Sequence, residues 1–486
     1  MPRAVKMRRA AGAVGRRAAP ARPSVPLLRF LGATETVTGS RFLIDTPRAR
    51  VLLDCGLFQG LKALRERNWA TFPVDPASID AVVLSHAHLD HSGYVPALTR
   101  NGFAGRIFTT EATTALSRIV LPDSGHLQEE DAAYANRRGF SKHVPALPLY
   151  TEEDALRALQ RFTALPFGVP SDVAAGVRIT FQSSGHILGA ASVSVSLDGA
   201  RMRRIVFSGD LGRPQHPILQ PPAPLPEADV VLVESTYGNR QHEDVESLRR
   251  FEAALVRTAE RGGMVVIPAF AVDRTEVILF RLRQLMHAGR IPSLPVYVDS
   301  PMALATLAIY RQALAERNAQ VRPELCGSDD PFDPGRLVEA RRVEESIAIN
   351  DQPGPGIIIS ASGMATGGRV LHHLVHRLPE PRNTVMLVGF QAEGTRGRAL
   401  ADGAKAVKML GRYIAVRAEV VDVPAFSVHA DQREILNWLK ATRHAPEVTF
   451  IVHGEAPAAA SLHAAIESEL GWAAAVPRYL EQVRLD

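Results

Sequence analysis

Three histidines and an aspartate lie close together in the segment 85–91, which reads Ser-His-Ala-His-Leu-Asp-His. The segment directly follows the apolar run 81–84, which has the pattern of a buried β-strand. Imidazoles and a carboxylate at a strand end are poor core residues and good metal ligands. A random H-x-H-x-D-H in a chain of this length has odds of roughly one in a thousand. The pattern therefore indicates a metal site.

Other histidines and acids at strand ends could complete this site. His186 stands in a Gly-rich loop after a strand, and Asp210 and His453 each follow an apolar run. Taken alone, each residue is typical of a turn or a cap. Taken together, imidazoles and carboxylates at strand ends suit two divalent ions that share a carboxylate, and they favour zinc over magnesium. Asp54, one strand before the cluster, could orient a ligand imidazole without binding metal itself.

The composition is that of an ordinary globular chain. Its 486 residues are 46% hydrophobic and 22% charged, enough for a large core in two or three domains. Cys55 and Cys326 are far apart, which excludes a disulfide framework or a C-x-x-C zinc site and favours a reducing, cytoplasmic compartment. No run has the length of a membrane span and no secretory signal is visible, so we expect no membrane association.

The net charge of +5 originates in the N-terminal segment. Residues 1–26 contain seven Lys and Arg and no acid, so the rest of the chain carries a net charge of −2. This Ala-, Arg- and Pro-rich segment predicts a disordered basic tail. It could be an RNA-touching arm or an over-extended start of translation, and the biased composition common at termini favours the second interpretation.

The strands and helices that must position the candidate residues are arranged differently in two parts of the chain. Short β-type runs separated by turns fill the part from residue 27 to 237, whereas helices and strands alternate between residues 238 and 423. The alternation is typical of an α/β sheet, here inserted between strands of the metal domain. Residues 424–486 then return to that first domain.

Two features of the insert could bind a ligand: a phosphate in one case and a metal ion in the other. The strand 356–360 runs into a Gly-rich loop before a helix, where backbone N–H groups near Ser362 and Gly363 could bind a phosphate. His372 and His376 are one helical turn apart, a spacing that binds metal in some proteins. Neither a Glu-x-x pattern nor a third ligand is nearby, so we interpret them as histidines of the helix surface or the domain interface.

The ordered set of motifs resembles the metallo-β-lactamase superfamily. The residues that carry the resemblance are Asp54, His86, His88, Asp90, His91, His186, Asp210 and His453. The segments V-E-S-T-Y-G at Glu234, F-S-V-H-A-D at His429 and V-H-G-E at 452–455 further resemble the β-CASP branch, which contains RNA-processing and DNA-repair nucleases. Within that branch the chain is similar to the endonuclease subunit of the mRNA cleavage and polyadenylation machinery and its prokaryotic homologues. The resemblance extends from about Leu27 to the C-terminus.

The resemblance implies an α/β fold, an αββα sandwich with an inserted α/β β-CASP cap. The sandwich would comprise residues 27–237 and 424–486, and the cap residues 238–423. Two zinc ions are implied: one held by His86, His88 and His186, the other by Asp90, His91 and His453, with Asp210 as the bridge and Asp54 supporting the ligands. Glu234 and His429 would assist proton transfer to the leaving oxygen.

The implied activity is zinc-dependent hydrolysis of RNA, by endonuclease cleavage and also by 5′ exonuclease cleavage. In this branch a histidine at the position of His453 marks RNA-directed enzymes. Alternatives are a DNA nuclease, a small-ester or thioester hydrolase and, least favoured because every ligand is present, a non-catalytic RNA-binding scaffold. Homodimers occur in the family, so RNA and a second copy of the chain are the expected partners. Arg396 and Val428 depart from the family pattern and leave substrate preference open.

Overall fold

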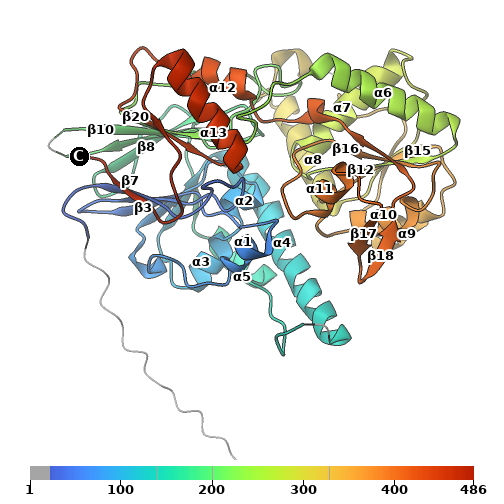
Figure 1. The fold of residues 1–486 in the computed structure, drawn as a ribbon, viewed down its shortest axis with the longest axis horizontal. Helices are drawn as coiled ribbons and strands as arrows, with labels where there is room; N and C mark the ends of the chain where they lie inside the picture. Colours follow the sequence, from blue (N-terminus) through green and yellow to red (C-terminus); the bar gives the residue numbers. More distant parts are fainter. Residues whose placement is uncertain (1–21, 140, 200, 328) are drawn as a thin grey trace, which may run out of the picture.

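The computed structural model describes residues 22–139, 141–199, 201–327 and 329–486, which form two lobes (Figure 1). One lobe contains two seven-stranded sheets and the other a six-stranded sheet. The basic tail predicted for residues 1–26 lies, up to residue 21, outside the described residues. None of the described helices is long and apolar enough to cross a bilayer.

The first sheet of the larger lobe brings Asp54 beside the histidine cluster. Its strands, in spatial order, are β22 (Gln482–Arg484), β1 (Leu27–Phe30), β2 (Phe42–Asp45), β3 (Arg50–Leu53), β4 (Ala81–Val83), β5 (Arg106–Thr109) and β6 (Phe162–Ala164). Strands β3 and β4 run parallel. Because the carboxyl ends of parallel neighbours meet at one edge, Asp54 after β3 and Ser85 after β4 leave the sheet side by side.

The second sheet places three further candidates at a common edge. Its strands, in spatial order, are β21 (Ala474–Ala475), β20 (Val448–Val452), β11 (Val230–Glu234), β10 (Arg203–Phe207), β9 (Ala191–Leu197), β8 (Val177–Ser183) and β7 (Ser171–Ala174). Strands β10, β11 and β20 are parallel neighbours. Asp210 after β10, Glu234 at the end of β11 and His453 after β20 therefore emerge together.

The two sheets pack face to face through an aromatic and aliphatic core. The ring centroids of Phe30 and Phe450 are 5.0 Å apart, and those of Phe42 and Phe207 are 5.3 Å apart. Helices α3 (Val95–Arg100) and α5 (Glu152–Leu159) pack on the outer face of the first sheet, and α12 (Gln432–Leu439) and α13 (Ala456–Ala465) on that of the second. This is the predicted αββα sandwich.

The second lobe is a parallel sheet with helices on both faces. Its strands, in spatial order, are β14 (Leu337–Glu339), β13 (Val296–Val298), β15 (Gly356–Ser360), β12 (Met264–Pro268), β16 (Thr384–Leu387) and β19 (Glu419–Asp422). One face is covered by α6 (Asp244–Glu260), α7 (Arg274–His287) and α8 (Pro301–Ala315), the other by α9 (Val343–Asn350), α10 (Val370–Arg377) and α11 (Arg396–Ala401). A hairpin of β17 (Ala406–Met409) and β18 (Arg412–Ala415) completes it. The inserted α/β cap is confirmed, while its limits at residues 238 and 423 stay a prediction.

Candidate metal centre

The predicted metal ligands converge where the strand ends of both sheets face the cap. The cluster 86–91 follows β4, and the short helix α2 (Leu89–Ser92) turns Asp90 and His91 back toward it. His186 comes from the loop between β8 and β9. The long helix α4 (Glu111–Arg138) runs next to the site, and its N-cap residue Thr110 donates a hydrogen bond to the carbonyl of Gly189 in the His186 loop.

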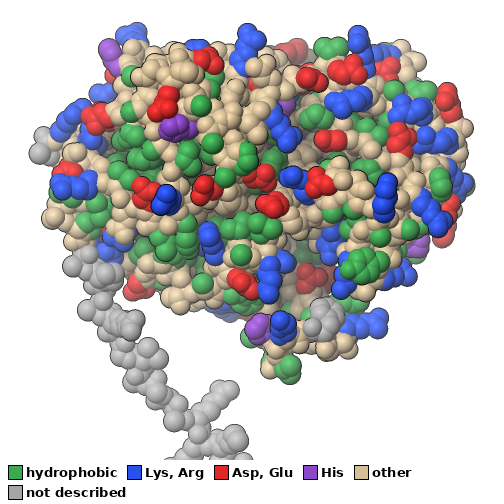
Figure 2. Space-filling view, in the orientation of Figure 1, with side chains coloured by type: hydrophobic (Ala, Val, Ile, Leu, Met, Phe, Trp, Pro, Cys, Tyr) green, Lys and Arg blue, Asp and Glu red, His purple; other side chains and the backbone are tan. Residues whose placement is uncertain are grey.

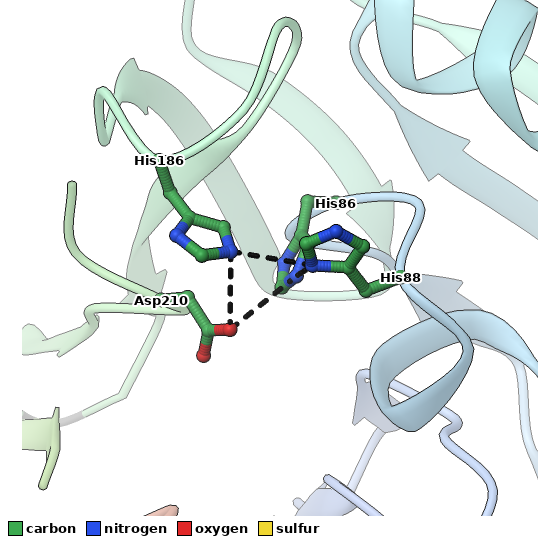
Figure 3. Close-up of side chains that lie close together, drawn as sticks. All are labelled: His86, His88, His186 and Asp210. Atoms are coloured by element: carbon green, nitrogen blue, oxygen red, sulfur yellow. Dashed lines mark hydrogen bonds and ion pairs between the residues drawn. The ribbon is translucent and has the colours of Figure 1, made fainter. Parts of the chain in front are cut away.

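Four side chains form the first ligand group, shown in Figure 3: His86, His88, His186 and Asp210. Nδ1 of His88 lies 3.1 Å from Nε2 of His86 and 3.2 Å from Nε2 of His186. Oδ2 of Asp210 lies 3.5 Å from Nε2 of His86 and 3.4 Å from Nε2 of His186. Three ring nitrogens and a carboxylate oxygen thus surround one point.

The first group fits a tetrahedral divalent ion. Ligands about 2.0–2.1 Å from a zinc ion stand about 3.3 Å from one another, close to the separations seen here. Burial lowers the pKa of His86 and His186 well below the ordinary value and that of His88 to about 4. The three imidazoles are therefore neutral at pH 7 and have lone pairs for a metal.

The second ligand group consists of Asp90, His91 and His453, whose ligand atoms all lie within 4.8 Å of one another. Nε2 of His91 is 3.0 Å from Nε2 of His453, which is 3.6 Å from Oδ2 of Asp90. Asp210 reaches this group with its other oxygen: Oδ1 lies 3.2 Å from Nε2 of His91. One carboxylate therefore faces both groups, as a bridging ligand would.

Hydrogen bonds behind the ligands hold their orientation. Oδ2 of Asp54 is 2.6 Å from Nδ1 of His91, which leaves Nε2 of that ring facing the centre. Ser85 donates to both oxygens of Asp54 through its backbone N–H and its hydroxyl. Burial opposes a charged His91, but Asp210 and Asp54 raise its pKa well above the ordinary value. The two carboxylates therefore favour a positive charge at the position of the His91 ring.

Two of these supporting residues were not predicted from the sequence. The hydroxyl of Ser85 lies 3.0 Å from Nδ1 of His86, and the hydroxyl of Thr236 lies 3.2 Å from Nδ1 of His453. The available signal was adjacency: Ser85 precedes His86, and Thr236 falls two residues after Glu234. A hydroxyl beside a ligand motif is too common to be singled out on that ground.

The predicted pair Glu234 and His429 lies at the border of the centre. Nδ1 of His429 is 3.2 Å from both carboxylate oxygens of Glu234 and 3.9 Å from Oδ2 of Asp210. The backbone N–H of Leu211 donates to Oε1 of Glu234 at 2.7 Å, which fixes the carboxylate. Burial lowers the pKa of His429, but Glu234 and Asp210 raise it more, so it lies above the ordinary value. His429 is thus suited to carry a proton near neutral pH.

A cavity of about 2040 Å³ opens onto both groups. The sandwich lines it with His88, Asp90 and His186, and the cap contributes Phe270 and Arg369 among others. On the face seen in Figure 2, Lys and Arg side chains are spread over both lobes among Asp and Glu. Charge on that face is mixed, in agreement with the small net charge of the chain after residue 26.

The loop that contains Ser362 and Gly363 lies on the cap side of this cavity. The hydroxyl of Ser362 accepts hydrogen bonds from the backbone N–H groups of Thr366 and Gly367, at 3.0 and 3.4 Å. These two groups are therefore not both free for a phosphate, as the sequence pattern had suggested. Arg396, which departs from the family pattern, donates to the carbonyls of two residues of this loop. Phosphate contact by Ser362 and Gly363 stays a prediction.

Other polar clusters have structural explanations. His372 and His376 are exposed on α10 and belong to none of the ligand groups found among the described residues. His242, Asp431 and Glu434 do form a compact group. In that group the Asp431 side chain caps α12, and the carboxylate of Glu434 accepts a hydrogen bond from the Asp431 N–H. This capping box explains why the acids of the group lie close together.

Comparison with known proteins places these motifs in a family. Three family models match in succession: the metallo-beta-lactamase superfamily over residues 36–256, the Beta-Casp domain over 275–400, and the Zn-dependent metallo-hydrolase RNA specificity domain over 413–477. A crystal structure of a protein of unknown function from Enterococcus faecalis has a TM-score of 0.50 at 14% identity, over 95% of this chain and 100% of that one, and it shows the fold alone.

Curated relatives match over most of their length. Ribonuclease TTHA0252 of Thermus thermophilus is 39% identical over 87% of this chain and 92% of its own. The RNase J-like protein of Methanocaldococcus jannaschii is 31% identical over 88% of this chain and 92% of its own. Transcription termination factor FttA of Methanosarcina mazei is 32% identical over 94% of this chain and 71% of its own. The chain therefore belongs to the β-CASP branch of the metallo-β-lactamase superfamily.

Proposed function

We propose that this protein is a metal-dependent ribonuclease that hydrolyses RNA phosphodiester bonds in the cavity between sandwich and cap. The observation that carries the proposal is the position of Glu234 and His429 beside two ligand groups that share Asp210. A metal site alone suits many hydrolytic reactions, whereas a proton donor next to it suits an ester with a poor leaving group. The names of the relatives, a ribonuclease and an RNase J-like protein, support RNA as the substrate.

The proposal includes two zinc ions per chain. His86, His88 and His186 would hold the first ion, Asp90, His91 and His453 the second, and Asp210 would contact both. Divalent ions bound there supply a nucleophile at neutral pH and neutralise charge on the phosphoryl oxygens. The imidazole-rich ligand set favours zinc over magnesium or calcium.

His429 and Glu234 would handle the leaving group. The leaving ribose oxygen needs a proton as the phosphorus–oxygen bond breaks. His429 can donate it, because Glu234 and Asp210 raise its pKa above the ordinary value and so favour its protonated form. Glu234 holds Nδ1 of that imidazole and stabilises its charged form. Asp54 acts further from the reaction, because it fixes the His91 ring.

The alternative functions agree less well with the size of the cavity or with the names of the relatives. At about 2040 Å³ the cavity exceeds the roughly 300–1,000 Å³ of small-molecule sites, which argues against a small-ester or thioester hydrolase. A DNA nuclease would use the same centre, and only a direct comparison of substrates distinguishes it. A non-catalytic scaffold would have no need of the complete ligand set.

The test is cleavage of 5′-labelled and 3′-labelled RNA, with matched DNA, by the zinc-loaded protein and by Asp210→Ala. We expect internal RNA fragments from both labels, additional shortening from the 5′ end, intact DNA and no cleavage by the variant. Intact RNA under every metal condition would contradict the proposal. Cleavage of DNA at an equal rate would favour the alternative nuclease.

The proposal also covers the setting in which the enzyme acts. Cys55 and Cys326 are both free thiols, as expected for a protein of the reducing cytoplasm. A homodimer is proposed by analogy with the family. Light scattering coupled to size-exclusion chromatography would measure the mass directly, and a mass near the 52.7 kDa of one chain would exclude the dimer.

A further inference from the structure

Arg274 is a buried arginine with two donor atoms that have no hydrogen-bond partner among the described residues. It is the first residue of cap helix α7, and only 4% of its surface is exposed. Its Nε and Nη1 atoms are both shielded and make no hydrogen bond within the described chain. A guanidinium stays charged at any physiological pH, so burial cannot neutralise it. Native proteins seldom leave such a group unsatisfied, which points to a ligand as the missing partner.

The acid that precedes Arg274 in the chain is already engaged in hydrogen bonds elsewhere. The carboxylate of Asp273, the preceding residue, accepts from the hydroxyl of Tyr310 at 2.7 Å and lies 3.0 Å from Nε2 of His216. The neighbouring charged group Arg213 repels Arg274, and it pairs with Asp244 on its other side. Asp273 and Tyr237 favour the charge of Arg274 through space, but among the described side chains none accepts a hydrogen bond from its Nε or Nη1.

Arg274 lines the cavity of the metal centre together with His429 and Phe270. Its charge acts on His429, whose pKa it lowers against the larger effect of Glu234. Gly389 packs beside the guanidinium, and a Cβ at that position would lie 3.5 Å from Nη2, an ordinary contact distance. A ligand that reaches Arg274 through the cavity therefore also lies close to the proposed proton donor.

Two other arginines of the cavity, Arg369 and Arg396, differ from Arg274 because they have structural partners. Arg369 pairs with Asp299 at 2.8 Å, and Arg396 donates to the carbonyl oxygen of Lys408 at 2.8 Å. Their positive charges are thus used in holding the cap together. Of these three arginines, Arg274 has buried donors without a hydrogen-bond partner, and its charge lowers the pKa of His429.

We propose that Arg274 binds a non-bridging oxygen of the RNA phosphate that lies beside His429 and is cleaved there. A guanidinium matches a phosphate in shape and charge, and it binds this group more specifically than an ammonium does. In a water-poor site a fixed cation also stabilises the charge that develops on the phosphoryl oxygens during cleavage. The proposal rests on the proposed ribonuclease function and adds a substrate-contacting residue to it.

The first experiment compares cleavage by Arg274→Ala and by the exposed control Arg433→Ala, both with measured zinc content. We expect kcat/KM of Arg274→Ala to fall by about 100-fold, the size of effect seen when one transition-state donor is removed. Zinc content should stay at the wild-type value, and Arg433→Ala should cleave RNA normally. Guanidinium chloride at low millimolar concentration should restore part of the activity of Arg274→Ala and none of that of His429→Ala. Absence of rescue, or an unchanged kcat/KM, would overturn the proposal.

The second experiment uses stability, because a structural arginine and a substrate-binding arginine predict opposite results. Arg274→Met removes the unpaired charge and keeps most of the volume, so its Tm without RNA should equal or exceed that of the wild type. A clearly lower Tm would assign Arg274 a structural role and overturn the proposal. Inorganic phosphate should raise the Tm of the wild type more than that of Arg274→Met. If the wild type cleaves no RNA yet shows this difference, the ribonuclease function fails and the anion site stands.

Discussion

The hydroxyl of Tyr310, on cap helix α8, accepts a hydrogen bond from the backbone N–H of Leu188 at 3.0 Å, two residues after His186. The same hydroxyl donates to Oδ1 of Asp273 at 2.7 Å. Gln320 adds a second bond from the cap, since its Oε1 accepts from the N–H of Gly189 at 3.2 Å. The cap therefore supports the loop that positions His186, in addition to closing the cavity.

Replacement of Tyr310 by Phe should loosen this support. The N–H of Leu188 would stay buried without an acceptor, which costs about 1–3 kcal/mol of unfolding free energy. The affinity for zinc should fall by about tenfold or more, in line with losses seen when support for a metal ligand is removed. Denaturant unfolding and competitive zinc titration measure the two effects. Tyr413→Phe, at a residue 75% exposed, is the matched control. Zinc affinity equal to that of the wild type would show that the cap bond has no part in positioning His186.

The two ligand groups predict a specific pattern of metal content. His88→Ala should lose the first ion and His453→Ala the second, so that each retains about one zinc per chain, whereas Asp210→Ala should lose affinity at both sites. His444→Ala changes a histidine whose side chain is 80% exposed, and it should retain both ions. Metal analysis of the purified variants by mass spectrometry gives the stoichiometry. A wild type with one ion, or two ions retained in His88→Ala, would contradict this assignment.

Glu234 and His429 should act as a unit in cleavage. His429→Ala should reduce kcat by about 10²–10⁴-fold, the usual contribution of a general acid, with zinc content unchanged. Glu234→Gln keeps an acceptor for the N–H of Leu211 but removes the charge that stabilises protonated His429, so a smaller loss is expected. The double variant should be little worse than His429→Ala. Full activity of zinc-loaded His429→Ala would remove this residue from the mechanism.

The ligand groups could be predicted from sequence because each member follows an apolar strand. Parallel pairing of β3 with β4, and of β11 with β10 and β20, then brings Asp54, Asp210 and His453 to the same region. The α/β cap follows from the alternation of strands and helices between residues 238 and 423, whereas the αββα sandwich was implied by the family resemblance. The local sequence pattern and the strand topology are enough to predict a site residue that directly follows its own strand.

Contacts that depend on distant packing could not be predicted in this way. Tyr310 is one aromatic residue on an apolar helix, and its two polar partners come from segments 122 and 37 positions away. The isolation of Arg274 is a property of its whole surroundings, since sequence does not reveal that Asp273 is already engaged. In the Ser362 loop, likewise, sequence does not reveal that the Ser362 hydroxyl accepts from the N–H groups of Thr366 and Gly367.

The Ser362 loop supplies the last prediction, because a substitution can change its charge without breaking its bonds. An aspartate at this position still offers an oxygen to the N–H groups of Thr366 and Gly367, so the loop should keep its conformation. The added negative charge would repel a phosphate in the cavity, so Ser362→Asp should weaken RNA binding by about tenfold, or about 1.4 kcal/mol. Binding is measured with the inactive Asp210→Ala background, and Ser468→Asp adds the same charge at an exposed site as a control. Equal affinities of the two aspartate variants would mean that no phosphate lies near Ser362.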